Sequence, residues 1–139
     1  MIVKAFQTYL ETVAGITALV STRIYPRHLP RDTTTYPVLT HQLISNIHGH
    51  VLGGAAGITT ATVQVDCWGL KLSDVETLAE AVRVALQGFM GSMGSVSVHF
   101  VSIENEHDQH EAPKDASETW LYRRVIDVQV KYAESVPTF

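Results

Sequence analysis

The sequence predicts an α+β fold in which two helices pack on one face of a mainly antiparallel sheet. Two segments repeat apolar residues at three- and four-residue steps, as amphipathic helices do. Several others alternate apolar and polar residues, and turns rich in glycine and proline separate them, which is typical of strands that pair through hairpins. The expected order is α-β-β-β-α-β-β. Because 139 residues normally form one domain, we expect a single domain over residues 1–139, with 134–139 as a flexible tail.

The first predicted helix lies at the N-terminus. Its apolar stripe is formed by Ile2, Phe6, Tyr9, Leu10 and Val13. Gly15 is suited to its C-terminal cap, and residues 17–20 are compatible with a short second helix. The extended segment 23–26 follows, where proline disfavours a central strand, and residues 27–37 are expected to form an exposed loop.

The next two predicted strands cover residues 38–47 and 60–68. The second alternates clearly, with Ala61, Val63, Val65 and Cys67 on one side and polar residues and Trp68 on the other. Four glycines fall within residues 48–58, so the connection is expected to be a long, flexible hairpin loop.

The second predicted helix begins at Ser73, which can form a capping box with Glu76, and ends near Gly88. Its inner face is expected to comprise Val75, Leu78, Ala79, Val82 and Leu86. Valine-rich residues 95–103 and alternating residues 120–132 predict the last two strands. Arg124 interrupts the apolar face of the final strand.

The composition excludes several function classes. The formal charge is −4, and no cluster of Lys and Arg is large enough for a surface that binds duplex DNA. A single cysteine can form neither an intrachain disulfide nor a thiolate-rich zinc site. We find neither a basic apolar leader nor a run long enough to span a bilayer, so we expect an uncleaved, soluble, intracellular chain with no membrane partner.

The charge is concentrated in one segment. Residues 104–118 contain six acids and one base, a net charge of −5, whereas the other 124 residues carry eight acids and nine bases, a net charge of +1. We expect this segment to form an acidic loop, including Glu104, Glu106, Asp108 and Glu111.

The histidines offer the strongest argument for an enzyme. His107, Asp108, His110 and Glu111 are possible metal ligands within five residues, and His48 and His50 form a second pair. However, the histidines of the first group are three residues apart in an expected loop, whereas the H-E-x-x-H motif places them four apart on a helix. We favour a solvated acidic loop and predict no metal site, with a small metal-dependent hydrolase as the enzymatic alternative.

No other constellation requires catalysis. Cys67 lies at an inward-facing strand position that suits a buried apolar residue. The serines lack a G-x-S-x-G elbow, and residues 53–57 lack the spacing of a nucleotide-binding loop. We therefore predict no catalytic residues, no cofactor and no enzyme activity. Trp68, on the polar side of its strand, is assigned to a subunit interface.

Several short motifs occur in a characteristic order along almost the whole chain. They are Arg23-Ile-Tyr-Pro26 with Leu29-Pro30 and Pro37, Leu52-Gly-Gly54 with Gly57, Val63-Gln-Val-Asp-Cys-Trp68, Leu78-Ala-Glu-Ala-Val-Arg83 with Leu86 and Gly88, Glu106 with Asp108 and Glu111, and Tyr122-Arg-Arg124 with Asp127. In these motifs the chain resembles the tail-completion proteins of long-tailed bacteriophages, also called tail terminators or tail-to-head joining proteins. Residues 109–119 depart from the turn expected before the last strand.

The resemblance implies a structural protein of a phage or prophage virion, assembled in the host bacterial cytoplasm. It implies a homohexameric ring that caps the head-proximal end of the tail tube, stops tube polymerisation and binds the head connector, while DNA passes through without specific binding. It implies neither a cofactor nor catalytic residues. A different neck or head-completion component is the alternative within this class.

A closed ring uses two different patches on each subunit, and long loops can supply both. We hypothesise that the loops at 48–58 and 27–37 contact neighbouring subunits or the tail tube. The candidate interface residues are His48, His50, Leu52, Gly53, Gly54, Gly57, Trp68, Arg27 and Arg31. The acidic segment is assigned to the lumen or to a face that meets a basic partner, where carboxylates would repel DNA over about 8 Å at physiological salt; an ordinary solvated loop is the alternative.

Overall fold

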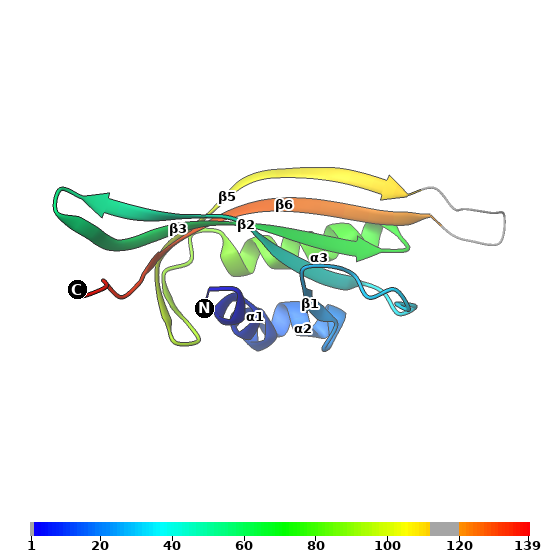
Figure 1. Cartoon of the computed structure of the whole chain (residues 1–139). Coiled ribbons are helices and arrows are strands. Elements are labelled where there is room, and N and C mark those ends of the chain that lie inside the picture. Colours follow the sequence, from blue (N-terminus) through cyan, green and yellow to red (C-terminus); the bar gives the residue numbers. More distant parts are fainter. Residues whose placement is uncertain (1, 112–119) are drawn as a thin grey trace.

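The computed structural model describes residues 2–111 and 120–139, the latter with the last strand and the C-terminus (Figure 1). Its elements are α1 (Ile2–Thr12), α2 (Ala14–Val20), β1 (Ile24–Pro26), β2 (Val38–Val51), β3 (Gly54–Gly69), α3 (Leu72–Leu86), β4 (Gly91–Met93), β5 (Val96–Glu111) and β6 (Leu121–Ala133). The α+β class is confirmed. The predicted order omits two elements of the described chain, α2 and the short β4 before β5, although the short helix considered at residues 17–20 does lie within α2.

The strands form one sheet in the order β1-β2-β3-β6-β5-β4. Every neighbouring pair is antiparallel except β1 and β2, which run parallel, so the sheet is mixed but mainly antiparallel. The three helices lie on one face of this sheet (Figure 1). The sheet extends beyond the helices at both ends, where the β2–β3 hairpin projects on one side and β5 and β6 project on the other.

The core lies between the helices and the inward side chains of the central strands. Ala61, Val63, Val65 and Cys67 of β3 are buried there, as the alternation predicts, together with Ile126, Val128 and Val130 of β6. The predicted inner face of α3 is confirmed, since Val75, Leu78, Ala79, Val82 and Leu86 are all buried. Burial of each of the larger side chains among them, the valines, leucines and isoleucine, stabilises the fold by about 1.5–3 kcal/mol.

The predicted helix ends are only partly correct. Gly15 does not cap the first helix, because α1 ends at Thr12 and Gly15 lies within α2. The chain bends at Val13, whose φ and ψ of −83° and 109° are extended. The capping box at Ser73 is also wrong, since α3 begins at Leu72 and its N-cap Lys71 makes no side-chain capping bond. Gly88 adopts φ +76° just beyond α3, as expected for a terminating glycine.

The predicted long loop at residues 48–58 is wrong. β2 continues to Val51 and β3 begins at Gly54, so only residues 52 and 53 form the turn. Gly53 has φ +98°, the left-handed conformation that glycine adopts readily. Gly49 instead lies within β2, next to a register shift, where a Cβ atom would approach the Ile58 carbonyl oxygen to 2.9 Å. There glycine permits a close approach of two strands and does not mark a loop.

The acidic segment also differs from the predicted loop. Residues 104–111 belong to β5 and pair with β6, while residues 112–119 lie outside the described part of the chain. The pairing places Asp108 opposite Arg124 and Gln109 opposite Arg123. These basic partners, which are distant in sequence, make a strand favourable for a segment whose composition indicates a solvated loop.

A polar cluster is buried beneath β2. His41 is only 1% exposed, and its Nε2 lies 2.5 Å from Gln7 Oε1, while Gln7 Nε2 donates to the Ile24 carbonyl at 2.9 Å. The His41 ring also packs on Phe6, with a centroid separation of 5.4 Å. Burial lowers the pKa of His41 to about 4, since the charged imidazolium would lose its hydration. At neutral pH the ring is therefore neutral and donates its Nε2 proton to Gln7.

This low pKa predicts a loss of stability in acid. Between the ordinary value of 6.5 and about 4, the unfolded chain binds a proton at His41 that the folded chain does not. Stability is therefore lost as the pH falls through this window, and we expect a loss of about 2 kcal/mol from this residue between pH 7.5 and pH 5. Urea unfolding of the wild type and His41→Phe at both pH values measures it. Equal losses in the two proteins would contradict the assignment.

Candidate assembly surfaces

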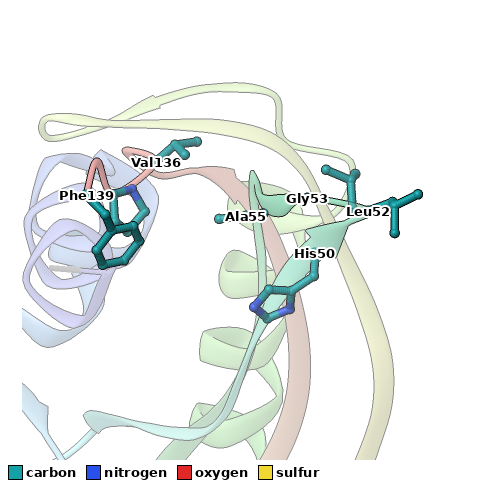
Figure 2. Close-up of a pocket in the computed structure, with 9 residues that line it drawn as sticks. His50, Leu52, Gly53, Ala55, Val136 and Phe139 are labelled. Carbon is teal, nitrogen blue, oxygen red and sulfur yellow. The ribbon is translucent and has the colours of Figure 1, made fainter.

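A groove lies between the tip of the β2–β3 hairpin and the C-terminal segment (Figure 2). Its volume is about 580 Å³, and its lining is mostly apolar: His50, Val51, Leu52, Gly53, Gly54, Ala55, Val136, Pro137 and Phe139. Leu52 and Phe139 are fully exposed and Val51 and Val136 are more than half exposed. Apolar side chains gathered at a projecting tip are typical of a surface that another protein covers.

The C-terminal segment is attached to the base of this hairpin. His48 Nδ1 donates to the Glu134 carboxylate at 2.6 Å, and the Glu134 backbone N–H donates to the Gly57 carbonyl at 2.9 Å. Hydrogen bonds from the Thr59 hydroxyl and from His48 lower the pKa of the Glu134 carboxyl. Gly57 has φ +77°, and a Cβ atom there would lie 3.2 Å from Val136. Residues 134–139 carry no secondary structure, and Glu134 holds their start against the hairpin.

At the opposite end of the sheet, an ion pair joins β3 and β6 on the face away from the helices. Asp66 is only 5% exposed, and its carboxylate accepts hydrogen bonds from Arg123 Nη2 at 3.1 Å and from Gln64 Nε2 at 3.2 Å. The Arg123 guanidinium lies 4.9 Å from the centroid of the Trp68 ring, and Trp68 Nε1 donates to the Thr40 hydroxyl at 3.0 Å. Trp68 thus has both a cation–π contact and a hydrogen bond within its own chain. Its place at a subunit interface stays a prediction.

A second charged cluster lies on the helix-bearing face of the same end. Arg124 Nε donates to Asp108 at 2.5 Å, and its other nitrogens lie 3.8 Å from Glu76 of α3 and 4.0 Å from Glu106. The hydrogen bond to Asp108 raises the pKa of Arg124. The cluster explains why an arginine interrupts the apolar side of β6. At Arg124 this side of the strand extends beyond the core, and the guanidinium is surrounded by three carboxylates.

The predicted interface residues fall in three separate places, one of which is the position of Trp68 beside Arg123 at the far end of the sheet. The structure brings His50, Leu52, Gly53 and Gly54 together in the groove, with His48 and Gly57 at its base. Arg27 and Arg31 lie elsewhere, in the exposed segment after β1. Arg27 lines a separate cavity of about 470 Å³ with Val3 and residues 41–43.

Sequence reasoning missed the contribution of the C-terminal segment and of the arginines on β6. Val136 and Phe139 line the groove, but apolar residues in a short tail carry no periodic signal. The adjacent Arg123 and Arg124 point to opposite faces because successive strand residues alternate, and the sequence pattern alone predicts this difference. The acids that they meet lie on other strands, so the pairing itself carries no local signal.

The described residues contain no group of three or more His, Cys, Asp or Glu side chains able to hold a metal ion. His107 and Asp108, as neighbours in β5, point to opposite faces, so these two possible metal ligands do not converge on one point. The Glu111 side chain lies outside the described part. Cys67 is fully buried and its pKa is raised, mainly by burial, which favours an unreactive thiol. None of the described helices has the length and apolar character needed to cross a lipid bilayer.

Comparison of the sequence with models of protein families and with curated proteins gives no match. Among solved structures, the chain is similar to a chain of the "Virion of native gene transfer agent (GTA) particle". The TM-score is 0.64 at 15% sequence identity, over 93% of this chain and 91% of that chain. At this identity the likeness concerns the fold. The chain therefore shares its fold, over nearly its full length, with a chain from that virion particle.

Proposed function

We propose that this protein is a structural component of a phage or phage-like virion, and that it caps the head-proximal end of a tail tube as a ring, ending tube polymerisation and joining the tail to the head. The observation that carries the proposal is the near full-length likeness to a chain of a gene transfer agent virion. The short motifs that resemble tail-completion proteins extend along the same length of chain.

The exposed apolar groove supports an assembly role. Leu52 at the hairpin tip and Phe139 in the C-terminal segment line the same groove from different sides, and both are fully exposed. Such exposed apolar side chains around one groove are typical of a surface that another protein covers. We assign this end of the sheet to contacts with the tail-tube protein or the head connector. Arg27 and Arg31, in the exposed segment 27–37, are assigned to a second contact with neighbouring subunits.

Glu104, Glu106 and Asp108 lie on exposed parts of β5. Arg124 offsets part of their charge, through ion pairs with Glu106 and Asp108. We propose that the remaining negative charge faces the passage for DNA, where it repels phosphates and prevents adhesion. The protein would then act without catalysis, cofactor or specific DNA binding.

Disabling the gene tests this role, with electron microscopy of the particles produced. We expect filled heads beside tails that are several times longer than normal, because nothing stops the polymerisation of the tube. Restoring the gene in trans should restore the normal length. Tails of normal length that fail to join heads would instead indicate another neck component, and unchanged particles would exclude a role in the virion.

A further inference from the structure

Both long edges of the sheet are open over part of their length. β1 pairs only with residues 39–41 of β2, and no other strand of the described chain covers the outer edge of residues 42–51. On the other side, β4 covers residues 96–98 of β5, and the backbone of residues 88 and 89 is hydrogen-bonded to Val101. Beyond Val101, no described strand pairs with the outer edge of β5. Each open edge presents unpaired N–H and C=O groups that can pair with another strand.

The directions of the strands make these two edges complementary. β2, β3, β6 and β5 are successive neighbours and each pair is antiparallel, so β5 runs opposite to β2. In a ring, rotation about the axis preserves strand direction relative to that axis. The β5 edge of one subunit therefore meets the β2 edge of the next in an antiparallel orientation, which permits regular hydrogen bonding.

From these observations, and resting on the ring of the proposed function, we infer that residues 42–51 of one copy pair with residues 102–111 of the next, so that the sheets join into a closed barrel. The partner is thus a second copy of this chain. The charges favour this arrangement, because residues 42–51 contain no carboxylate. Pairing of two β5 edges would instead bring Glu104, Glu106 and Asp108 close to their own copies.

The offset between the two edges matches the geometry of a barrel. Within one subunit, Gln42 of β2 lies at the same height as Asn105 of β5, because the pairs Gln42–Gln64, Gln64–Asp127 and Asp127–Asn105 connect them across the sheet. Full overlap of residues 42–51 of one copy with residues 102–111 of the next therefore requires the two strands to be offset by about six residues, or roughly 20 Å. Four strand spacings separate one β2 from the next, about 19 Å. In closed barrels the strands are tilted by about 35–45° from the barrel axis. At this tilt, two equivalent strands about 19 Å apart are offset along the strand direction by roughly 13–19 Å.

The alternation of the strands limits the register. Ile47, 66% exposed, pairs with Thr60 and so points away from the helices, as Asn105 and His107 do on β5. A stagger of this size places Ile47 opposite Asn105 or His107 of the neighbouring copy. His110 lies on the other face of β5 and cannot be its partner.

Cysteine cross-linking of the purified full-length chain tests the pairing. The variants are Ile47→Cys with Asn105→Cys and Ile47→Cys with His107→Cys; the matched controls are Ile47→Cys with His110→Cys and Ile47→Cys alone. After mild oxidation at high protein concentration, we expect at least one test pair to give a ladder of covalent multimers, with at least tenfold more cross-linked chain than either control. Native mass spectrometry should show that the reduced variants form the same oligomer as the wild type.

Two outcomes would overturn the inference. The absence of a ladder from both test pairs, whether the chain is oligomeric or monomeric, excludes this edge pairing. A covalent dimer from Ile47→Cys alone would show that two β2 edges pair about a twofold axis instead. Tail length after gene disruption is measured independently of the cross-linking. Long tails without a ladder would support the proposed function and reject the barrel. A ladder with tails of normal length would support the barrel and reject the proposed function.

Discussion

Replacement of Phe6 by alanine is expected to lower the free energy of unfolding by about 3–5 kcal/mol, the range for a large aromatic side chain removed from a core. Phe6 is 0% exposed and packs against His41 beneath β2. The lost side chain leaves a cavity that surrounding groups cannot fill, because α1 is held in place by the Gln7 hydrogen bonds to Ile24 and His41. Guanidinium unfolding at a fixed, low protein concentration measures the change.

Phe6→Leu is the matched control, since it retains much of the buried apolar volume. We expect a loss less than half that of Phe6→Ala. Equal losses in the two variants would mean that ring shape, and not cavity volume, determines stability at this position. A loss below about 1 kcal/mol for alanine would contradict the burial of Phe6.

Replacement of Arg123 by methionine is expected to destabilise the protein by about 3 kcal/mol, because it leaves the Asp66 carboxylate buried without a counter-charge. In the variant, Gln64 remains as the side-chain partner of Asp66 among the described residues. The Trp68 ring also loses the guanidinium that lies 4.9 Å from its centroid. The lower end of the range for buried pairs applies, since the Arg123 side chain is 25% exposed.

Two further variants separate charge from packing. Asp66→Asn combined with Arg123→Met removes both charges and should recover a large part of the lost stability. Arg83→Met breaks an exposed ion pair with Glu80 on α3 and should leave the unfolding midpoint almost unchanged. If Arg123→Met behaved like Arg83→Met, the pair with Asp66 would contribute nothing that a surface pair does not.

The groove and the open edges together give the proposed ring two kinds of contact. Edge pairing would join neighbours around the ring through backbone hydrogen bonds, leaving the tip of the β2–β3 hairpin free for the tail tube or the head connector. The same hairpin supplies the open edge and the apolar tip, so assembly of the ring would also fix the position of the tips. This division of roles depends on the length of β2, which the sequence did not predict.

The inner side of the sheet and the buried face of α3 can be predicted from the sequence. The alternation through Val63, Val65 and Ile126 and the helical spacing of Val75, Leu78 and Val82 are local patterns, and the structure buries all six residues. The sequence also favoured a buried, unreactive Cys67 and the terminating role of Gly88, because both depend on their immediate neighbours in the chain.

The lengths of the strands, in contrast, depend on contacts between segments that are distant in the sequence. Glycines at 49, 53, 54 and 57 and acids at 104–111 indicate loops when considered locally, yet both segments pair as strands apart from the turn at residues 52 and 53. Their partners are distant in sequence: Glu134 and Gly57 meet at the hairpin, and Arg124 meets Asp108. Strand ends, sheet edges and charge clusters depend on such cross-strand contacts, which no local pattern encodes, whereas core faces depend on hydrophobic periodicity, which the sequence encodes directly.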